Sequence, residues 1–168
     1  MMENIAKLKN NLKIVLLIYF FSMMLSSLIV FILNIKEGYL TFNNNLGDWI
    51  DIFFHNLKIH VLLIFGGIIF SIPSIIILIF NGLISGFYIS QSIVLNESGA
   101  LFKNIFMHGF LEMPATLLSV AVSLQVTYYC YSRVFKKRLV LLRNFSFHIS
   151  VPIIIVLTLL AAIIEGNI

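Results

Sequence analysis

The chain has 168 residues, of which 60% are hydrophobic and only 11% are charged. Soluble domains carry about a quarter charged residues, so this chain has too few to cover a water-soluble surface. The mean hydropathy of +1.04 also indicates an integral membrane protein whose surroundings are a lipid bilayer. The net charge of +4 comes from basic residues beside apolar runs, where membrane topology explains them better than nucleic-acid binding. A single cysteine, Cys130, excludes an internal disulfide and a multi-cysteine metal site.

Five apolar stretches are long enough to cross a membrane, which takes roughly 20 residues. The apolar region from Trp49 to Leu95 is too long for one span, and Ser71–Ser74 ("SIPS") predicts a break, because proline removes a backbone donor and disfavours helix before it. No signal-peptide cleavage site follows the first stretch, which we interpret as a retained span. The expected fold is an all-α, polytopic transmembrane helix bundle, one domain over residues 1–168. Its predicted spans are about 14–35, 49–70, 75–94, 102–129 and 145–164.

Basic residues predict the orientation of these spans. Lys7, Lys9 and Lys13 precede the first span, and a second basic group follows the fourth: Arg133, Lys136, Lys137, Arg138 and Arg143. Basic residues gather in cytoplasmic loops. Five spans with a cytoplasmic N-terminus place both groups inside, whereas merging the second and third spans would place the second group outside.

Small residues recur at four-residue spacing in the third and fourth spans. Gly82, Gly86 and Ser90 form one stripe, and Ala115, Ser119 and Ser123 form another. Such stripes let helix backbones approach closely in lipid. We expect the third and fourth spans to pack through them.

The segment "MHGFLEMPATLLS" places ionisable residues at the start of the fourth span. His108 and Glu112 are four residues apart and share one helix face. Gly109 leaves room for a neighbour, and Pro114 prevents a normal bond to the preceding turn. Ionisable groups inside a membrane are costly and usually face a cavity or the bundle interior.

The expected topology brings further polar residues to the same, outer leaflet. The second span enters there with Asp51, His55, Asn56 and Lys58, and the fifth ends there at Glu165. Helices that present these residues inward would form one polar cluster with His108 and Glu112. Asn81 lies deeper, toward the inner side of the third span.

Three interpretations of this cluster stay open. It could be structural, a substrate or proton path that continues past Asn81, or a chemical site. In the chemical interpretation, Glu112, His108 and Glu165 are the catalytic candidates, with Glu112 as a base or a ligand. The residues proposed to bind a divalent metal such as zinc are His108, Glu112, Glu165, His55 and Asp51. The supporting residues are Asn56, Asn81, Gly109 and Pro114.

The remaining histidines weigh less in this interpretation. His60 is expected to be a satisfied interior side chain, and His148 to lie at the interface near the inner end of the fifth span. A phosphate-binding loop and a nucleotide fingerprint are both missing from the sequence, which argues against a self-contained ATP-driven pump.

The segment His108-Gly109-x-x-Glu112-Met113-Pro114 resembles the opening of a transmembrane helix in the stage II sporulation protein M-like family of bacterial membrane proteins, which often have leucine where Met113 stands. Asn56, the Asn81–Gly82 step and the terminal "AAIIE" that ends in Glu165 are similar to family features in the same order. The resemblance covers about Trp49 to Glu165. It implies a multi-pass protein of the bacterial cytoplasmic membrane.

The resemblance implies two functional settings. One is the sporulation machinery that remodels cell-wall peptidoglycan, and the other is the gene clusters of circular bacteriocins. We favour the second: maturation, export or immunity of a hydrophobic, circular bacteriocin-like peptide, together with other membrane proteins of the same system. In that setting the polar site would cleave or join the peptide. The alternatives are a non-enzymatic scaffold of a sporulation or cell-wall remodelling complex and a small transporter-like protein, and whether the protein is an enzyme stays open.

Overall fold

The computed structural model describes residues 2–35, 48–95, 107–135 and 146–166, and all regular structure within these ranges is helical. Five of the helices are long and apolar enough to cross a membrane, as predicted. The fourth predicted span began at residue 102, and residues 102–106 lie outside the described ranges. The elements are α1 (Met2–Leu33), α2 (Trp49–Phe65), η1 (Gly66–Ile69), α3 (Ile72–Val94), α5 (Met107–Val134) and α6 (Phe147–Glu165).

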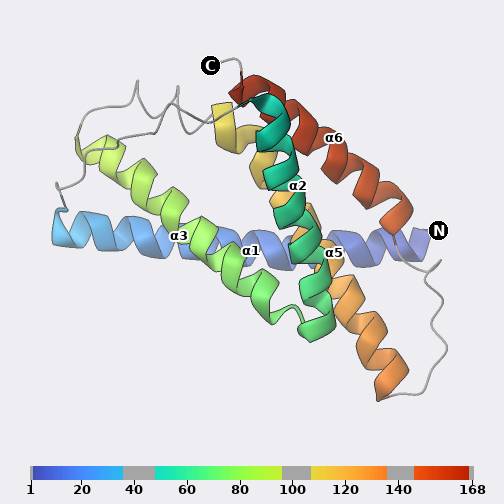
Figure 1. Cartoon of the computed structure of the whole chain (residues 1–168). Coiled ribbons are helices and arrows are strands. Elements are labelled where there is room, and N and C mark those ends of the chain that lie inside the picture. The colour runs from blue at the N-terminus through green and yellow to red at the C-terminus, as the bar shows by residue number, and fades with distance from the viewer. Residues whose placement is uncertain (1, 36–47, 96–106, 136–145, 167–168) are drawn as a thin grey trace.

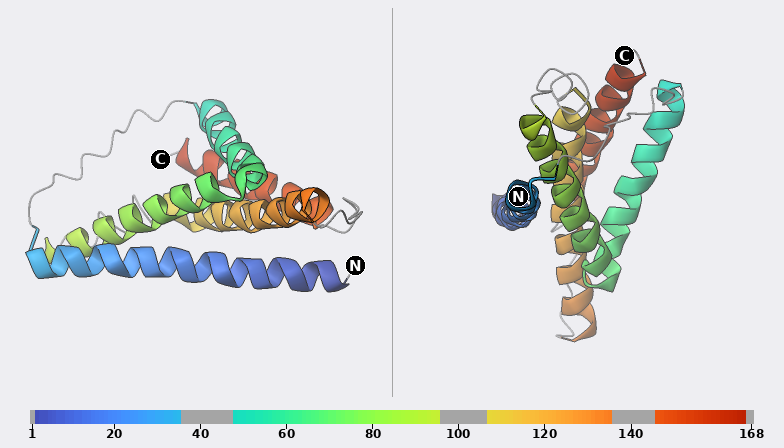
Figure 2. Two further views of the ribbon diagram at one scale, coloured as in Figure 1. Left: turned by 90° about the horizontal axis from the view of Figure 1, so that it is seen from below. Right: turned by 90° about the vertical axis from the view of Figure 1, so that its left-hand side faces the viewer.

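Helices α2, α5 and α6 contact one another, and α1 crosses the bundle with α3 lying along it (Figure 1). Both views in Figure 2 place α1 and α2 on opposite sides of the molecule. The starts of α2 and α5 meet the end of α6 at one end of the bundle, which we call the pocket end (Figure 1). A Cβ placed on Gly166 would lie 2.6 Å from the Cβ of Trp49, so only glycine lets the end of α6 reach the start of α2.

The predicted break at Ser71–Ser74 is a tight turn at the other end of the bundle. Helix α2 passes into the short 3-10 helix η1, then Phe70 (φ 55°) and Ser71 (φ 58°) take left-handed backbone conformations, and Pro73 stands in the first turn of α3. Left-handed backbone is uncommon for residues other than glycine. The surrounding contacts must therefore hold this turn in place.

A cluster of four buried or half-buried hydroxyl groups ties the turn to α5. The Oγ of Ser123 lies 3.0 Å from the Oγ of Ser71 and 2.9 Å from the Oγ of Ser74. Ser71 Oγ is also 2.7 Å from Thr127 Oγ1, which donates to the carbonyl of Gly67 at 2.9 Å. Buried hydroxyls need such partners because water is not available to them. We call Ser71, Ser74, Ser123 and Thr127 the hydroxyl cluster.

The small-residue stripe of α3 packs against α1. A Cβ on Gly82 would lie 2.8 Å from the carbonyl oxygen of Tyr19, and one on Gly86 would lie 2.9 Å from the carbonyl carbon of Met23. The prediction that the stripes of the third and fourth spans pack together is therefore wrong. Small residues permit a close approach by any helix, and their spacing does not say which helix approaches.

Apolar side chains fill the bundle beyond the pocket end. Leu63 of α2, Leu78 of α3 and Val120 of α5 are completely shielded from solvent. Long apolar side chains on the outside, such as Leu17 and Phe21 (each 71% exposed), fit a surface that faces lipid. The core cluster consists of Val15, Tyr19, Leu63, Leu78, Leu117, Val120 and Ala121.

Candidate functional site

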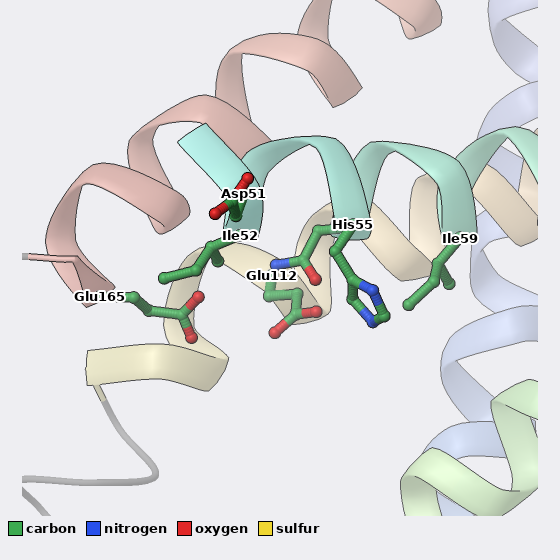
Figure 3. Close-up of a pocket in the computed structure, with 7 residues that line it drawn as sticks. Asp51, Ile52, His55, Ile59, Glu112 and Glu165 are labelled. Atoms are coloured by element: carbon green, nitrogen blue, oxygen red, sulfur yellow. The ribbon is translucent and has the colours of Figure 1, made fainter. Parts of the chain in front are cut away.

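A pocket of about 510 Å³ opens at the pocket end, between α2, α5 and α6 (Figure 3). It brings together three carboxylates, one imidazole and one carboxamide from three helices. The structure thus places Asp51, His55, Glu112 and Glu165 around one space, as the topology predicted, and their chemical role stays a prediction. The lining residues are Asp51, Ile52, His55, Asn56, Ile59, Glu112 and Glu165.

Helix α2 supplies most of the pocket lining because its residues recur at helical spacing. Asp51, His55 and Ile59 are separated by four residues each, and Ile52 and Asn56 repeat the same step one position later. Glu112 stands in the second turn of α5, and Glu165 is the last residue of α6. The close approach of Gly166 to Trp49 holds that last residue beside α2.

The pocket has a buried floor and an exposed rim. Glu165 and Asn56 are only 5% and 6% exposed, Glu112 is half-buried, and Asp51 and His55 are exposed. Figure 3 shows the side chains of Glu112, Glu165 and His55 pointing into one space, with Asp51 at its edge. A charged group that enters this pocket would pass the exposed Asp51 and His55 before it reaches the buried carboxylate of Glu165.

The carboxamide of Asn56 points to a missing acceptor. Its Nδ2 is buried and has no hydrogen-bond partner among the described residues. Leaving a buried donor unsatisfied costs about 1–3 kcal/mol. A ligand or water with an acceptor atom at this place in the pocket would remove that cost.

Other predicted site residues fall outside the pocket or outside the described atoms. His108 lies in the first turn of α5, but its side chain is outside the described atoms, so its place in the site stays a prediction. No described atom lies within 4 Å of a Cβ placed on Gly109, so no described helix fills the room predicted there. Pro114 is an exposed residue inside α5, and half-buried Asn81 on α3 does not line the pocket.

In the part of the chain that the structure describes, no three His, Cys, Asp or Glu side chains are grouped closely enough to hold a metal ion. The side chain of His108 is not among the described atoms. Metal binding by the predicted set therefore stays a prediction.

His60 is an interior side chain, as predicted, but within the described part of the chain only one of its two ring nitrogens is satisfied. It is 2% exposed, and its Nδ1 lies 3.1 Å from Ser119 Oγ, which donates to the carbonyl of Ala115 at 2.8 Å. This contact joins α2 to α5, although Nε2 has no partner among the described residues. His148 is exposed in the first turn of α6, which suits the interfacial place expected for it.

Two apolar lining residues were not predicted. Ile52 and Ile59 lie among the polar residues of α2 and give the pocket an apolar side. Their helical spacing from His55 and Asn56 would have predicted them, because residues three or four positions apart lie on the same face of a helix.

The apolar core lies directly beyond the pocket along α2 and α5. Leu63 follows Ile59 by one turn, and Leu117 and Val120 follow Glu112 on α5. These side chains pack against one another rather than line a passage. The packed core counts against a path from the pocket past Asn81.

Together, the five long apolar helices and the polar pocket at one end define a small multi-pass helical membrane protein. The sequence profile of stage II sporulation protein M matches residues 34–168, so the chain belongs to the stage II sporulation protein M family. The match includes every pocket residue and leaves the whole of α1 outside it. No curated protein and no solved structure matches the chain.

Proposed function

We propose that this protein acts in the maturation or export of a hydrophobic peptide, or in immunity to it, together with other membrane proteins of the same system. In this proposal the pocket binds the positively charged amino end of the linear peptide, before its ends are joined, while the rest of the peptide lies in the bilayer. The observation that carries the proposal is the gathering of three carboxylates and an unpartnered amide donor in one pocket.

The size of the pocket favours a molecular ligand over a bare ion. A volume of about 510 Å³ falls in the range of about 300–1,000 Å³ typical of small-molecule sites. A bound zinc ion needs three or four donor atoms within roughly 2.3 Å of one point. The three carboxylates come from three separate helices. They suit a ligand that is large enough to contact several carboxylates at once.

The lining chemistry matches a peptide amino end. An ammonium group donates to carboxylates, and its charge would offset that of Asp51, Glu112 and Glu165. The first carbonyl oxygen of the peptide lies two bonds beyond the amino-bearing carbon and could accept from Asn56 Nδ2. Ile52 and Ile59 offer an apolar contact for the first side chain.

Titration of a synthetic hydrophobic helical peptide of about 20 residues tests this proposal. The protein is held in lipid nanodiscs, and the peptide carries a fluorophore at its carboxyl end and a free or acetylated amino end. We expect acetylation to weaken binding about tenfold, which is ~1.4 kcal/mol. We expect Glu112→Gln to weaken binding of the free peptide by a similar factor and to leave the acetylated peptide unaffected.

Asp48→Asn is the matched control for this titration. Asp48 is an exposed carboxylate one turn before the pocket, it caps no backbone group with its side chain, and it does not line the pocket. Its replacement should leave both affinities unchanged. Equal affinity for the free and acetylated peptides would contradict the proposal.

A metal-dependent reaction at Glu112, His108 and Glu165 is tested by the metal content of the purified protein. Near-stoichiometric zinc that is lost in folded His108→Ala and Glu112→Gln variants would support cleavage or joining of the peptide at a metal centre. Peptide binding by metal-free protein would instead support a site that works through its carboxylates alone.

A further inference from the structure

Lys58 occupies an unusual place in α2. The apolar helical segment that includes α2 runs from Trp49 to Ile69, and its 21 residues are enough to cross a membrane. Lys58 is nine residues from its start, about 13 Å along the helix at 1.5 Å per residue. A hydrocarbon core is about 30 Å thick, so Lys58 stands near its middle.

The side of α2 that carries Lys58 faces away from the bundle. At about 100° per residue, Lys58 lies within about 40° of Phe54, Leu62 and Phe65 around the helix axis. These three side chains are 61%, 58% and 62% exposed, and Lys58 is exposed with them. The buried side chains of α2, Asn56, His60 and Leu63, lie on the opposite side. Figure 2 shows α2 at the edge of the bundle, so no described helix covers this side.

An exposed lysine at this depth is costly in lipid. A lysine at the centre of a span is among the least favourable residues to insert, and such residues almost always face protein or water. If the side chain bends toward the pocket end, the ammonium moves by about one helix turn, ~5 Å. It is then still deeper in the membrane than Trp49 at the start of α2. Lys58 makes no hydrogen bond or ion pair with another described residue.

We propose that this side of α2 is a docking surface for a transmembrane helix of another protein, and that the partner helix carries an Asp or Glu at the depth of Lys58. The ammonium and carboxylate would then remove each other's cost of burial in lipid. Phe54, Leu62 and Phe65 would form the apolar contact around the pair. This interface lies on the side of α2 opposite its buried face, and its apolar residues Phe54, Leu62 and Phe65 do not line the pocket.

A second copy of this chain is the wrong occupant on charge grounds. Two copies inserted in the same direction are related by an axis along the membrane normal, so equivalent residues lie at the same depth, and a residue at the centre of a symmetric contact faces its own equivalent. Lys58 would then meet Lys58 of the second copy. Like charges at short distance in lipid repel strongly.

Photo-crosslinking in the membranes of cells that naturally make the protein tests the docking surface. Benzoylphenylalanine replaces Phe54 or Leu62 in the full chain, and Phe21 of α1 and Phe80 of α3 serve as controls because they are also exposed, at 71% and 59%. We expect the two α2 positions to give a discrete protein adduct that the controls lack. Peptide mapping should place the adduct in a transmembrane segment that contains Asp or Glu.

Variants of Lys58 then separate a charge pair from an incidental contact. The adduct yield should fall at least about fivefold in Lys58→Leu and persist in Lys58→Arg. Lys58→Leu should still fold, since leucine inserts far more readily than lysine at this depth. Adducts with lipid only, with a second copy of the chain, or with a segment that lacks an acidic residue would overturn the proposal, as would an unchanged yield in Lys58→Leu.

Discussion

Two buried serines on α5 differ in their surroundings and should differ in what their replacement costs. Ser123 Oγ lies within hydrogen-bonding distance of both Ser71 and Ser74, whereas Ser132 Oγ is buried with no partner among the described residues. We expect Ser123→Ala to lower the free energy of unfolding by about 0.5–2 kcal/mol. Ser132→Ala should be neutral or slightly stabilising. Thermal unfolding of both variants in the same detergent measures the difference, and equal losses would show that the hydroxyl cluster does not hold the turn.

At the residue scale, the sequence could identify the pocket residues better than their surroundings. Asp51, His55, Glu112 and Glu165 were grouped because each stands near a helix end that the topology assigns to one leaflet. The burial of Asn56 and the exposure of Lys58 could not be read in the same way. Both depend on which side of α2 faces α5 and α6. His55, Asn56 and Lys58 are polar and stand close together on α2, so the sequence does not show which of them faces the bundle.

At the scale of helices, the pairing of α1 with α3 depends on glycine. A Cβ on Gly86 would collide with the backbone of Met23, which cannot move without shifting α1. We expect Gly86→Ala to lower the free energy of unfolding by about 1–3 kcal/mol, the usual cost of overpacking. Gly109→Ala is the matched control, since no described atom lies within 4 Å of its added methyl group.

Thermal unfolding in detergent compares these two glycine variants. Gly109→Ala should be neutral or stabilising, because alanine favours helix over glycine. A Gly86→Ala variant as stable as the original chain would mean that α1 and α3 do not pack as described.

Helix boundaries were more predictable than helix partners. Hydropathy and the proline of "SIPS" located α2, α3 and α6 to within a few residues, because lipid demands long apolar helices. Helix α1 begins well before the predicted start of the first span, and α5 continues beyond the predicted end of the fourth. The partner of the stripe with Gly82 and Gly86 was predicted incorrectly. Tyr19 and Ser27 of α1 add hydrogen bonds to Ser85 and the carbonyl of Gly86, and nothing in the spacing of α3 marks those residues as its neighbours.

At the scale of the whole molecule, the pocket end should face the outside of the cell. The basic N-terminus and Arg133 belong to the other end, where the ammonium of Lys7 lies 5.7 Å from the ring centre of Tyr128 near the end of α5. In a chain whose Cys130 is replaced by serine, we expect Asp48→Cys to react with a membrane-impermeant maleimide in intact cells. Arg133→Cys should react only after the membrane is opened, and the reverse pattern would invert the topology.

The most direct measurement for the central claim is to locate the amino end of a bound peptide. A synthetic hydrophobic peptide of about 20 residues, with a free amino end and benzoylphenylalanine as its second residue, is irradiated with the protein in nanodiscs, and the adduct is mapped by mass spectrometry. We predict attachment within α2 at the pocket, at or beside Ile52, His55 or Ile59, and loss of the adduct when the amino end is acetylated. Attachment spread over the exposed faces of α1 and α3, or an adduct unaffected by acetylation, would contradict a pocket that binds the peptide's amino end.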